Sequence, residues 1–301
     1  MPERHPGKFL DKSGNYEVRE CVSCGFRHLY PLPDNQALKE FYEADYYQRH
    51  KPEYIDQDSR DARYLEIAYD ERLTVLSHLT SGRRILDVGC GSGMFLEYAS
   101  RKAWDCTGIE PSEMAAAEAM RRGLNVFPGT LEGFIGQSRG LYDVVYLKNV
   151  LEHVREPEKT LSSCRGLLRG GGVLFVEVPN DYEFMQRFGV WLLRERKSWI
   201  TVPDHINYFD FASLRRLLLR TGMVPVQRST SFPIYGLLMF GQNFISDRSV
   251  GKRAHHLRMD FEFFWDGVRL RCVKNAIYGL LAFLGTGRTV IYYCKAGKER
   301  G

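Results

Sequence analysis

Three glycines at alternate positions follow a short apolar run and precede a helical pattern. The apolar run covers residues 85–88, the glycines are Gly89, Gly91 and Gly93, and the helical pattern begins at Met94. A strand that turns through glycines into a helix gathers backbone N–H groups and the positive end of the helix dipole at one place. Glycine also lets a ligand approach the backbone closely. The stretch therefore predicts a binding site for a small ligand.

Two acidic residues add to this pattern. Asp87 precedes the first glycine by two positions, where a buried carboxylate can hold the turn and reach an ammonium group. Glu110 ends the next predicted strand, about 20 residues further on, where an acid can accept hydrogen bonds from ribose hydroxyls. Dinucleotide-binding enzymes share this layout, but a dinucleotide has no ammonium group near Asp87. S-adenosylmethionine (SAM) has one, so the pair of acids favours SAM over NAD.

At these positions the sequence resembles the class I SAM-dependent methyltransferases. The resemblance rests on the Gly-x-Gly-x-Gly spacing together with the two acids, and it implies an enzyme that binds SAM. An NAD-dependent oxidoreductase and a SAM-binding protein without catalysis are the alternatives. The implied contacts are Gly89, Cys90, Gly91 and Gly93 with the methionine part of SAM, Asp87 with its ammonium group, and Glu110 with its ribose.

The resemblance implies further contacts after the third and fourth strands. Thr130 and Leu131 would lie beside the adenine, although the acid that is usual in the family is missing there. Asn149 and Leu151 follow the strand predicted at 141–147 and would lie beside the methyl sulfonium. Ligands of open α/β sheets bind beyond such strand ends. Asn149 is for this reason also a candidate for a catalytic role.

The run Leu-Glu-His-Val at 151–154 resembles small-molecule methyltransferases, including the O-methyltransferases of ubiquinone biosynthesis. Some of those enzymes carry Glu-x-x-Glu-His at this point and use it to hold a divalent cation. Asn149 stands here in place of the first glutamate. A helix start beside the cofactor is therefore the favoured role of Glu152 and His153.

A catalytic base is expected in the long stretch 181–210, because loops at this edge carry the acceptor pocket in the resembled class. His205 lies there, directly after Asp204. A neutral imidazole is suited to accept a proton near neutral pH. The competing interpretation is that His205 only stabilises the loop.

The N-terminal residues 1–58 form a segment of their own. Cys21 and Cys24 are spaced as half of a zinc knuckle, and tetrahedral zinc needs four ligands. His5 and His28 are the nearest candidates to complete the set, while the alternative is a hairpin held by packing alone. An aromatic helix follows, and the resemblance suggests that Tyr46 or Tyr47 covers the cofactor as part of a lid. Packing between domains is the alternative role of that tyrosine.

The elements that must position these residues alternate between strand and helix from residue 59 onward. This alternation predicts an α/β fold, and the resemblance specifies a seven-stranded doubly wound sheet of the class I methyltransferase type. Residues 59–301 would form the SAM-binding domain, with a helical insertion at 230–288 before the last strand. The insertion is rich in apolar residues that need a partner, through docking on the sheet or a homodimer. They include Phe264, Leu280, Phe283 and Leu284.

Composition limits the remaining function classes. The 301 residues carry a formal charge of only +5, with 42 basic and 37 acidic residues well mixed, which argues against a nucleic-acid partner. No run approaches the ~18 apolar residues of a membrane span. The seven cysteines are scattered and odd in number, which favours the cytoplasm. We expect a small-molecule acceptor, such as a sugar, a nucleotide-linked sugar or a secondary metabolite.

Overall fold

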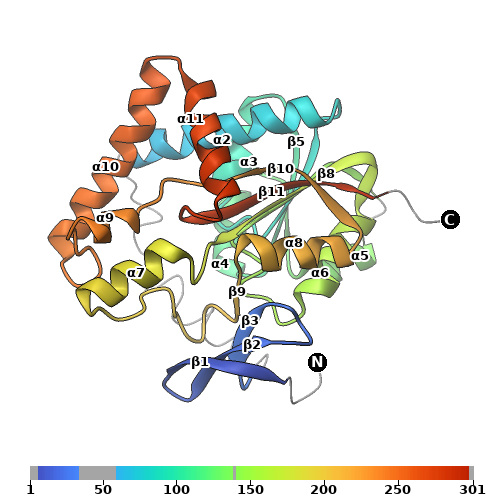
Figure 1. Cartoon of the computed structure of the whole chain (residues 1–301). Coiled ribbons are helices and arrows are strands. Elements are labelled where there is room, and N and C mark those ends of the chain that lie inside the picture. The colour runs from blue at the N-terminus through green and yellow to red at the C-terminus, as the bar shows by residue number, and fades with distance from the viewer. Residues whose placement is uncertain (1–5, 34–58, 138–139, 298–301) are drawn as a thin grey trace.

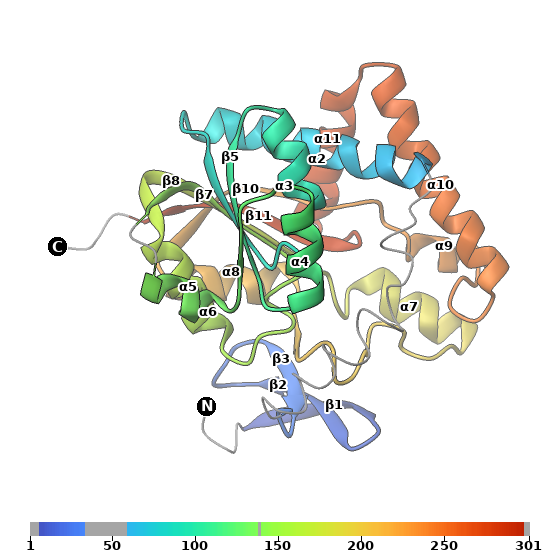
Figure 2. The same cartoon turned by 180° about the vertical axis from the view of Figure 1, so that it is seen from behind.

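The computed structural model describes residues 6–33, 59–137 and 140–297, and a seven-stranded sheet forms its centre (Figures 1 and 2). The strand order is β10-β11-β8-β7-β4-β5-β6. The strands from β8 to β6 are parallel, and β11 runs antiparallel to both of its neighbours. The predicted fold class is confirmed. The strands are β4 (Arg84–Val88), β5 (Asp105–Glu110), β6 (Val126–Pro128), β7 (Tyr142–Lys148), β8 (Leu168–Pro179), β10 (Met223–Ser229) and β11 (Thr289–Ala296).

Both faces of the sheet are buried, as parallel strands require. Successive side chains point to opposite faces, so each strand supplies two cores. One core contains Ile85, Val144, Tyr146 and Phe175 with helices α2 (Ser59–Leu79) and α3 (Met94–Arg101). The other contains Leu86, Val145, Leu147 and Leu174 with α5 (Leu131–Gln137), α6 (Pro157–Gly166) and α8 (Phe211–Arg220). Helix α4 (Glu113–Arg121) packs against β5 and β6.

A second, four-stranded sheet joins the N-terminal segment to the stretch after β8. Its order is β1 (Gly7–Ser13), β2 (Tyr16–Cys21), β3 (Arg27–Tyr30) and β9 (Asn207–Tyr208). The pairing of β3 with β9 sets Arg27 opposite Tyr208 and His28 opposite Asn207. Figure 1 shows this sheet below the larger one. The predicted aromatic helix with Tyr47 lies outside the described residues.

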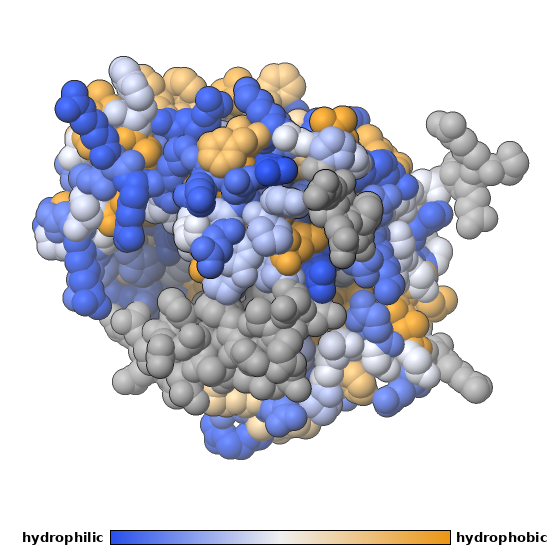
Figure 3. Space-filling view, turned by 90° about the horizontal axis from the view of Figure 1, so that it is seen from below, coloured by the Kyte–Doolittle hydropathy of each residue, from blue (hydrophilic) through white to orange (hydrophobic). Residues whose placement is uncertain are grey.

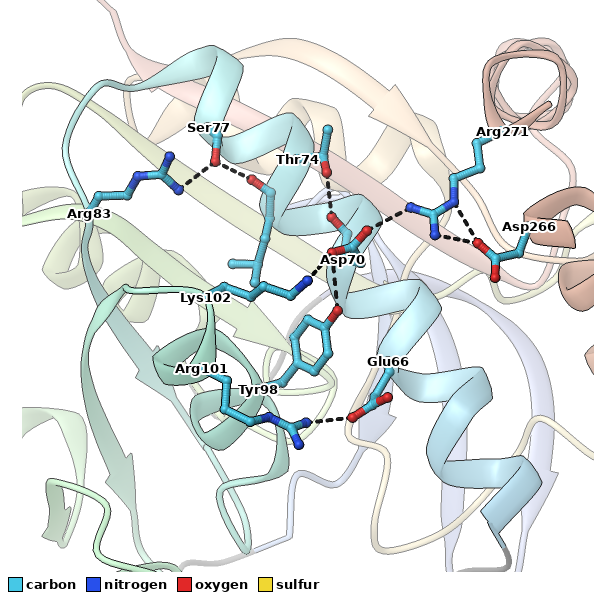
Figure 4. A network of polar contacts seen from close by, with 11 residues as sticks. Glu66, Asp70, Thr74, Ser77, Arg83, Tyr98, Arg101, Lys102, Asp266 and Arg271 are labelled. Atoms are coloured by element: carbon cyan, nitrogen blue, oxygen red, sulfur yellow. Dashed lines mark hydrogen bonds and ion pairs between the residues drawn. The ribbon is translucent and has the colours of Figure 1, made fainter. Parts of the chain in front are cut away.

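The insertion before the last strand is helical, as the sequence predicted. It comprises α9 (Gly236–Met239), α10 (Arg248–Gly267) and α11 (Arg271–Phe283), while α7 (Phe184–Leu193) follows β8. A polar network docks it on α2 (Figure 4). Arg271 bridges Asp266 and Asp70, with an Nη1 to Oδ2 distance of 2.7 Å to Asp70. Tyr98 of α3 and Lys102, which directly follows α3, also contact Asp70, at 3.1 and 3.2 Å.

Docking covers only part of the insertion. The side chains of the insertion that stay more than half exposed include Phe264, Leu280, Phe283 and Leu284.

Within residues 6–33, 59–137 and 140–297, every helix is too short or too polar to span a bilayer.

The buried Lys274 provides a test of how the insertion docks. Its side chain is fully buried, with Nζ 2.6 Å from Glu71 Oε1 on α2 and in contact with Glu262 on α10. Replacing Lys274 by alanine leaves two carboxylates without their cation, so we expect the free energy of unfolding to fall by about 3–5 kcal/mol. Urea denaturation measures it. The exposed Lys252→Ala in α10 is the control, and an equal loss in both variants would contradict the account.

Candidate functional site

The glycine turn after β4 has one position that opens to the outside. Gly89, Gly91 and Gly93 have φ values of 76°, 57° and 81°, in the left-handed region. A Cβ atom at Gly89 would lie 2.9 Å from Val150 Cγ2, and one at Gly93 would lie 2.3 Å from Leu124 Cδ1. A Cβ at Gly91 would meet no atom within 4 Å. Packing therefore excludes a side chain at the outer two glycines, whereas Gly91 borders open space that a ligand can enter.

Glu110 holds this turn in place. Its Oε2 accepts a hydrogen bond from the Gly91 N–H at 2.8 Å, and its Oε1 accepts one from the Ser112 N–H at 2.9 Å. The residue is only 5% exposed. A carboxylate offers about four acceptor positions, so these two donors do not exhaust it. The sequence predicted a ribose contact for Glu110 but missed its structural bond to the turn.

Asp87 is the second buried acid beside the turn. It is 4% exposed, and burial raises its pKa to about 8, opposed by Lys148 and reinforced by Glu110. Desolvation disfavours the charged carboxylate, and an adjacent cation restores it. An ammonium group placed next to Asp87 would therefore be bound by a charge-assisted interaction. The position fits the role that the sequence assigned to it.

Other predicted contact residues differ in what they can offer a ligand. Asn149 directly follows β7 with φ 55°, which is unusual for a residue other than glycine, and its N–H donates to the Glu177 carbonyl at 2.9 Å. Such strain is often found at functional sites.

Leu151 is fully buried, and Leu131 is 7% exposed. Thr130 is exposed, and its Oγ1 accepts from the Gly133 N–H at 3.3 Å. Their contacts with a ligand stay predictions.

Two histidines that are far apart in sequence meet after β7. The ring centroids of His153 and His205 are 5.0 Å apart in an edge-to-face arrangement. The nearest polar atoms of Glu152, His153 and His205 all lie within 4.8 Å of one another. Asp204 Oδ1 is 3.1 Å from His153 Nδ1, and Asp204 Oδ2 is 4.0 Å from His205 Nε2. We call these four side chains the histidine cluster. The sequence analysis did not connect the pair at 152–153 with His205, and its expectation of a helix start at that pair is wrong, because residues 151–153 form a turn and α6 begins only at Pro157.

Backbone hydrogen bonds hold the histidine cluster together. The carbonyl of Glu152 accepts from the N–H groups of Ile206 and Asn207, at 2.7 and 3.0 Å. The Asn207 amide nitrogen donates to the carbonyls of Leu151 and Val154, at 2.8 and 2.7 Å. The stretch 204–207 is thereby fastened to the turn after β7. No short-range pattern in the sequence predicts that these two segments bond to each other.

Burial and neighbouring charges shift the pKa values of two members of the histidine cluster, Glu152 and His153. Glu152 is 1% exposed, and burial raises its pKa to about 7, although His153 lowers it. Burial lowers the pKa of His153, but Glu152 and Asp204 raise it by more. Interacting groups of this kind share protons rather than titrate separately. Glu152 and His153 can therefore share a proton near neutral pH.

The CxxC segment brings three potential metal ligands together. Cys21, Cys24 and His28 place one ligand atom each within 4.8 Å of one another. The Cys24 N–H donates to Cys21 Sγ at 3.3 Å. His28 Nδ1 lies 2.8 Å from the Leu29 carbonyl, so this nitrogen is the donor and Nε2 is the ring atom that could bind a metal. Burial and Cys21 raise the pKa of the Cys24 thiol to about 12, so metal binding would release a proton.

Comparison with known proteins agrees with this geometry. A family model described as a methyltransferase domain matches residues 59–228. A ubiquinone biosynthesis O-methyltransferase of Vibrio parahaemolyticus is 35% identical over 152 residues, which cover 47% of this chain and 64% of that protein. A protein of the same name from Pectobacterium atrosepticum is 36% identical over 105 residues, covering 33% and 44%. The chain thus spans less than two thirds of either relative.

Two solved structures share the fold at low sequence identity. A SAM-dependent methyltransferase from Archaeoglobus fulgidus has a TM-score of 0.53 and 18% identity, covering 83% of this chain and 100% of that one. The plantazolicin methyltransferase BamL has a TM-score of 0.55 and 15% identity, covering 87% and 94%. At such identities the likeness concerns the fold alone.

Metal analysis tests the CxxC segment. If the two cysteines and His28 bind zinc, the purified protein should carry about one zinc ion per chain, and Cys24→Ser should lose it. Cys272→Ser, at an exposed cysteine of α11, should keep the metal and serves as the control. Elemental mass spectrometry measures the zinc content per chain. A metal-free protein of unchanged stability would leave packing as the reason for the two cysteines.

Proposed function

The chain belongs to the methyltransferase domain family, and we propose that it transfers a methyl group from SAM to a hydroxyl oxygen of a small-molecule acceptor. One observation carries the proposal. The open position at Gly91 lies at the end of β4, between the buried acids Asp87 and Glu110. The strand order reverses beside β4, since β5 and β7 flank it, and ligands of such sheets bind at this switch point.

The residues around the turn fit SAM group by group. Glu110 would accept hydrogen bonds from the ribose hydroxyls, and Asp87 would bind the ammonium group. Gly91 would border the methionine part, with Gly89, Cys90 and Gly93 shaping the turn. Thr130 and Leu131 are proposed to contact the adenine. Backbone atoms of Asn149 and Leu151, together with Tyr47 outside the described residues, complete the proposed site.

When bound, SAM supplies a methyl group that is activated by the positive sulfur. The protein's contribution is to align the acceptor with that carbon and to exclude water. His205 would accept the proton that the hydroxyl loses as the carbon–oxygen bond forms. Glu152 and Asp204, beside it in the histidine cluster, would stabilise the imidazolium. Asn149, at the end of β7, would position the acceptor.

The relatives inform the choice of acceptor atom and class. Both are named O-methyltransferases, which supports a hydroxyl rather than an amine or a carbon acceptor. Their name gives no support to the sugar or secondary metabolite that the sequence suggested. Membership of the family argues against an NAD-dependent oxidoreductase. A SAM-binding protein without catalysis is the remaining alternative, and turnover with any acceptor would exclude it.

The open glycine gives the first test. A valine at Gly91 would project its side chain into the space of the methionine part, so Gly91→Val should abolish SAM binding measured by calorimetry. Gly123→Val is the matched control, because Gly123 has φ 78° and no atom within 4 Å of its Cβ position, outside the turn. Both variants carry similar backbone strain. If the two variants bound SAM with equal affinity, Gly91 would not be part of the SAM site.

The histidine cluster gives the second test. With an acceptor found by screening hydroxylated compounds for release of S-adenosylhomocysteine, His205→Ala should lower turnover by about 10²–10⁴-fold. SAM affinity should stay nearly unchanged, because the proposed base touches the acceptor. His78→Ala, at an exposed position at the end of α2, is the control. If turnover by His205→Ala stayed within a few-fold of the wild type, His205 would not be the catalytic base.

A further inference from the structure

Helix α11 carries apolar side chains on the face that points away from the protein. Val273, Ile277, Leu280 and Leu284 follow one another at the spacing i, i+4, i+7 and i+11, which places them on one side of a helix. Together with Phe283 they are between 38% and 67% exposed, and we call these five side chains the outer face of α11. A surface helix of a globular protein normally turns such a face toward the core.

The opposite face of α11 carries its charges and docks the helix. Lys274 and Tyr278 are no more than 5% exposed, and both contact the carboxylate of Glu262 on α10. Arg271 reaches from the start of α11 toward Asp70 of α2 (Figure 4). Ion pairs therefore hold α11 on the protein, while its apolar side chains face outward. This inversion of the usual arrangement indicates an interaction surface.

The charged residues around the outer face are all basic. Residues 268–288 contain Arg269, Arg271, Lys274 and Arg288 and no acid. Arg269 lies just before α11 and Arg288 just after it, and both are exposed. Neither takes part in an ion pair within the part of the chain that the structure describes. Arg228 of β10 lies over the ring of Phe283, 4.9 Å from its centroid. Apolar and cationic groups are thus combined on one surface.

This surface lies at one end of the molecule. Helix α11 is at the top of Figure 1, on the opposite side from the N-terminal sheet. The side that carries the N-terminal sheet, seen from below in Figure 3, is largely hydrophilic. The protein can therefore approach an apolar partner with the α11 end while the other end stays in water.

A second copy of the chain fits the outer face poorly. In a two-fold dimer the same surface packs against itself. Arg269 and Arg288 would then meet arginines and no acid among residues 268–288 of the other copy. A bilayer with anionic lipids matches both properties, because its acyl chains receive apolar side chains and its headgroups attract arginine.

We propose that the outer face of α11 binds the surface of a lipid bilayer that contains anionic lipids. Leu280, Phe283 and Leu284 would enter the boundary between headgroups and acyl chains. Arg269 and Arg288 would pair with lipid phosphates. The helix would lie in the plane of the surface and not cross the bilayer. This inference goes beyond the proposed function and does not depend on it, since α11 contributes no residue to the proposed SAM site.

Sedimentation with lipid vesicles tests the proposal. The wild type should sediment with vesicles that contain phosphatidylglycerol, and much less with vesicles of phosphatidylcholine alone. The double variant Leu280→Gln, Phe283→Gln should weaken binding to the anionic vesicles by at least about 10-fold. The matched control is Phe9→Gln, Val22→Gln, at side chains of the N-terminal segment that are 54% and 80% exposed, and it should bind as the wild type does.

A second double variant tests the cationic part. Arg269→Gln, Arg288→Gln should weaken binding to the anionic vesicles, because headgroup attraction is lost. Its residual binding should respond less to added salt than that of the wild type. An unchanged affinity and salt response would contradict the role of the two arginines.

The proposal fails if the wild type does not bind anionic vesicles, if it binds neutral vesicles equally well, or if the matched control loses as much binding as Leu280→Gln, Phe283→Gln. Size-exclusion chromatography with light scattering tests the second copy as occupant. A wild-type dimer that becomes a monomer in Leu280→Gln, Phe283→Gln would also overturn the proposal. SAM affinity and melting temperature should be the same in all variants, so that failure of vesicle binding is distinguished from failure of the proposed function.

Discussion

The carboxylate of Glu110 is the interaction on which the glycine turn depends. It receives the N–H of Gly91 and the N–H of Ser112, and so joins the turn after β4 to the start of α4. A buried carboxylate is costly without donors, and the backbone supplies them here. The same group is the proposed ribose contact. The fold itself therefore holds the geometry that would receive the cofactor.

The acceptor side depends on a different constraint. The stretch around β9 bonds to the carbonyl of Glu152 and also pairs with β3 of the N-terminal sheet. His205 is thus positioned from two directions. A metal in the CxxC segment would stabilise the sheet that holds it, since His28 pairs directly with Asn207. The N-terminal sheet would then support the proposed base by fixing the position of β9.

The resemblance supplied the number of strands, and short apolar runs between turn residues, as at residues 85–88, indicated where the buried parallel strands lie. The sequence identified Asp87 and Glu110 as candidate ligand contacts because Asp87 precedes the first glycine by two positions and Glu110 ends the next strand. The pairing of β9 with β3 could not be found in this way, because it joins residues about 180 positions apart along the chain. The histidine cluster has the same origin, since His153 and His205 meet only when the long stretch after β8 folds back. Helix α7 was missed because its apolar residues were attributed to a loop.

The measurement that tests the central claim most directly is a crystal structure of the protein with S-adenosylhomocysteine. The account predicts ribose hydroxyls at hydrogen-bond distance from the Glu110 carboxylate, about 2.6–3.0 Å, and the amino group of the ligand beside Asp87. It also predicts that the ligand passes over Gly91 without displacing the turn. A ligand bound elsewhere on the protein, or bound without contact to Glu110, would contradict the account.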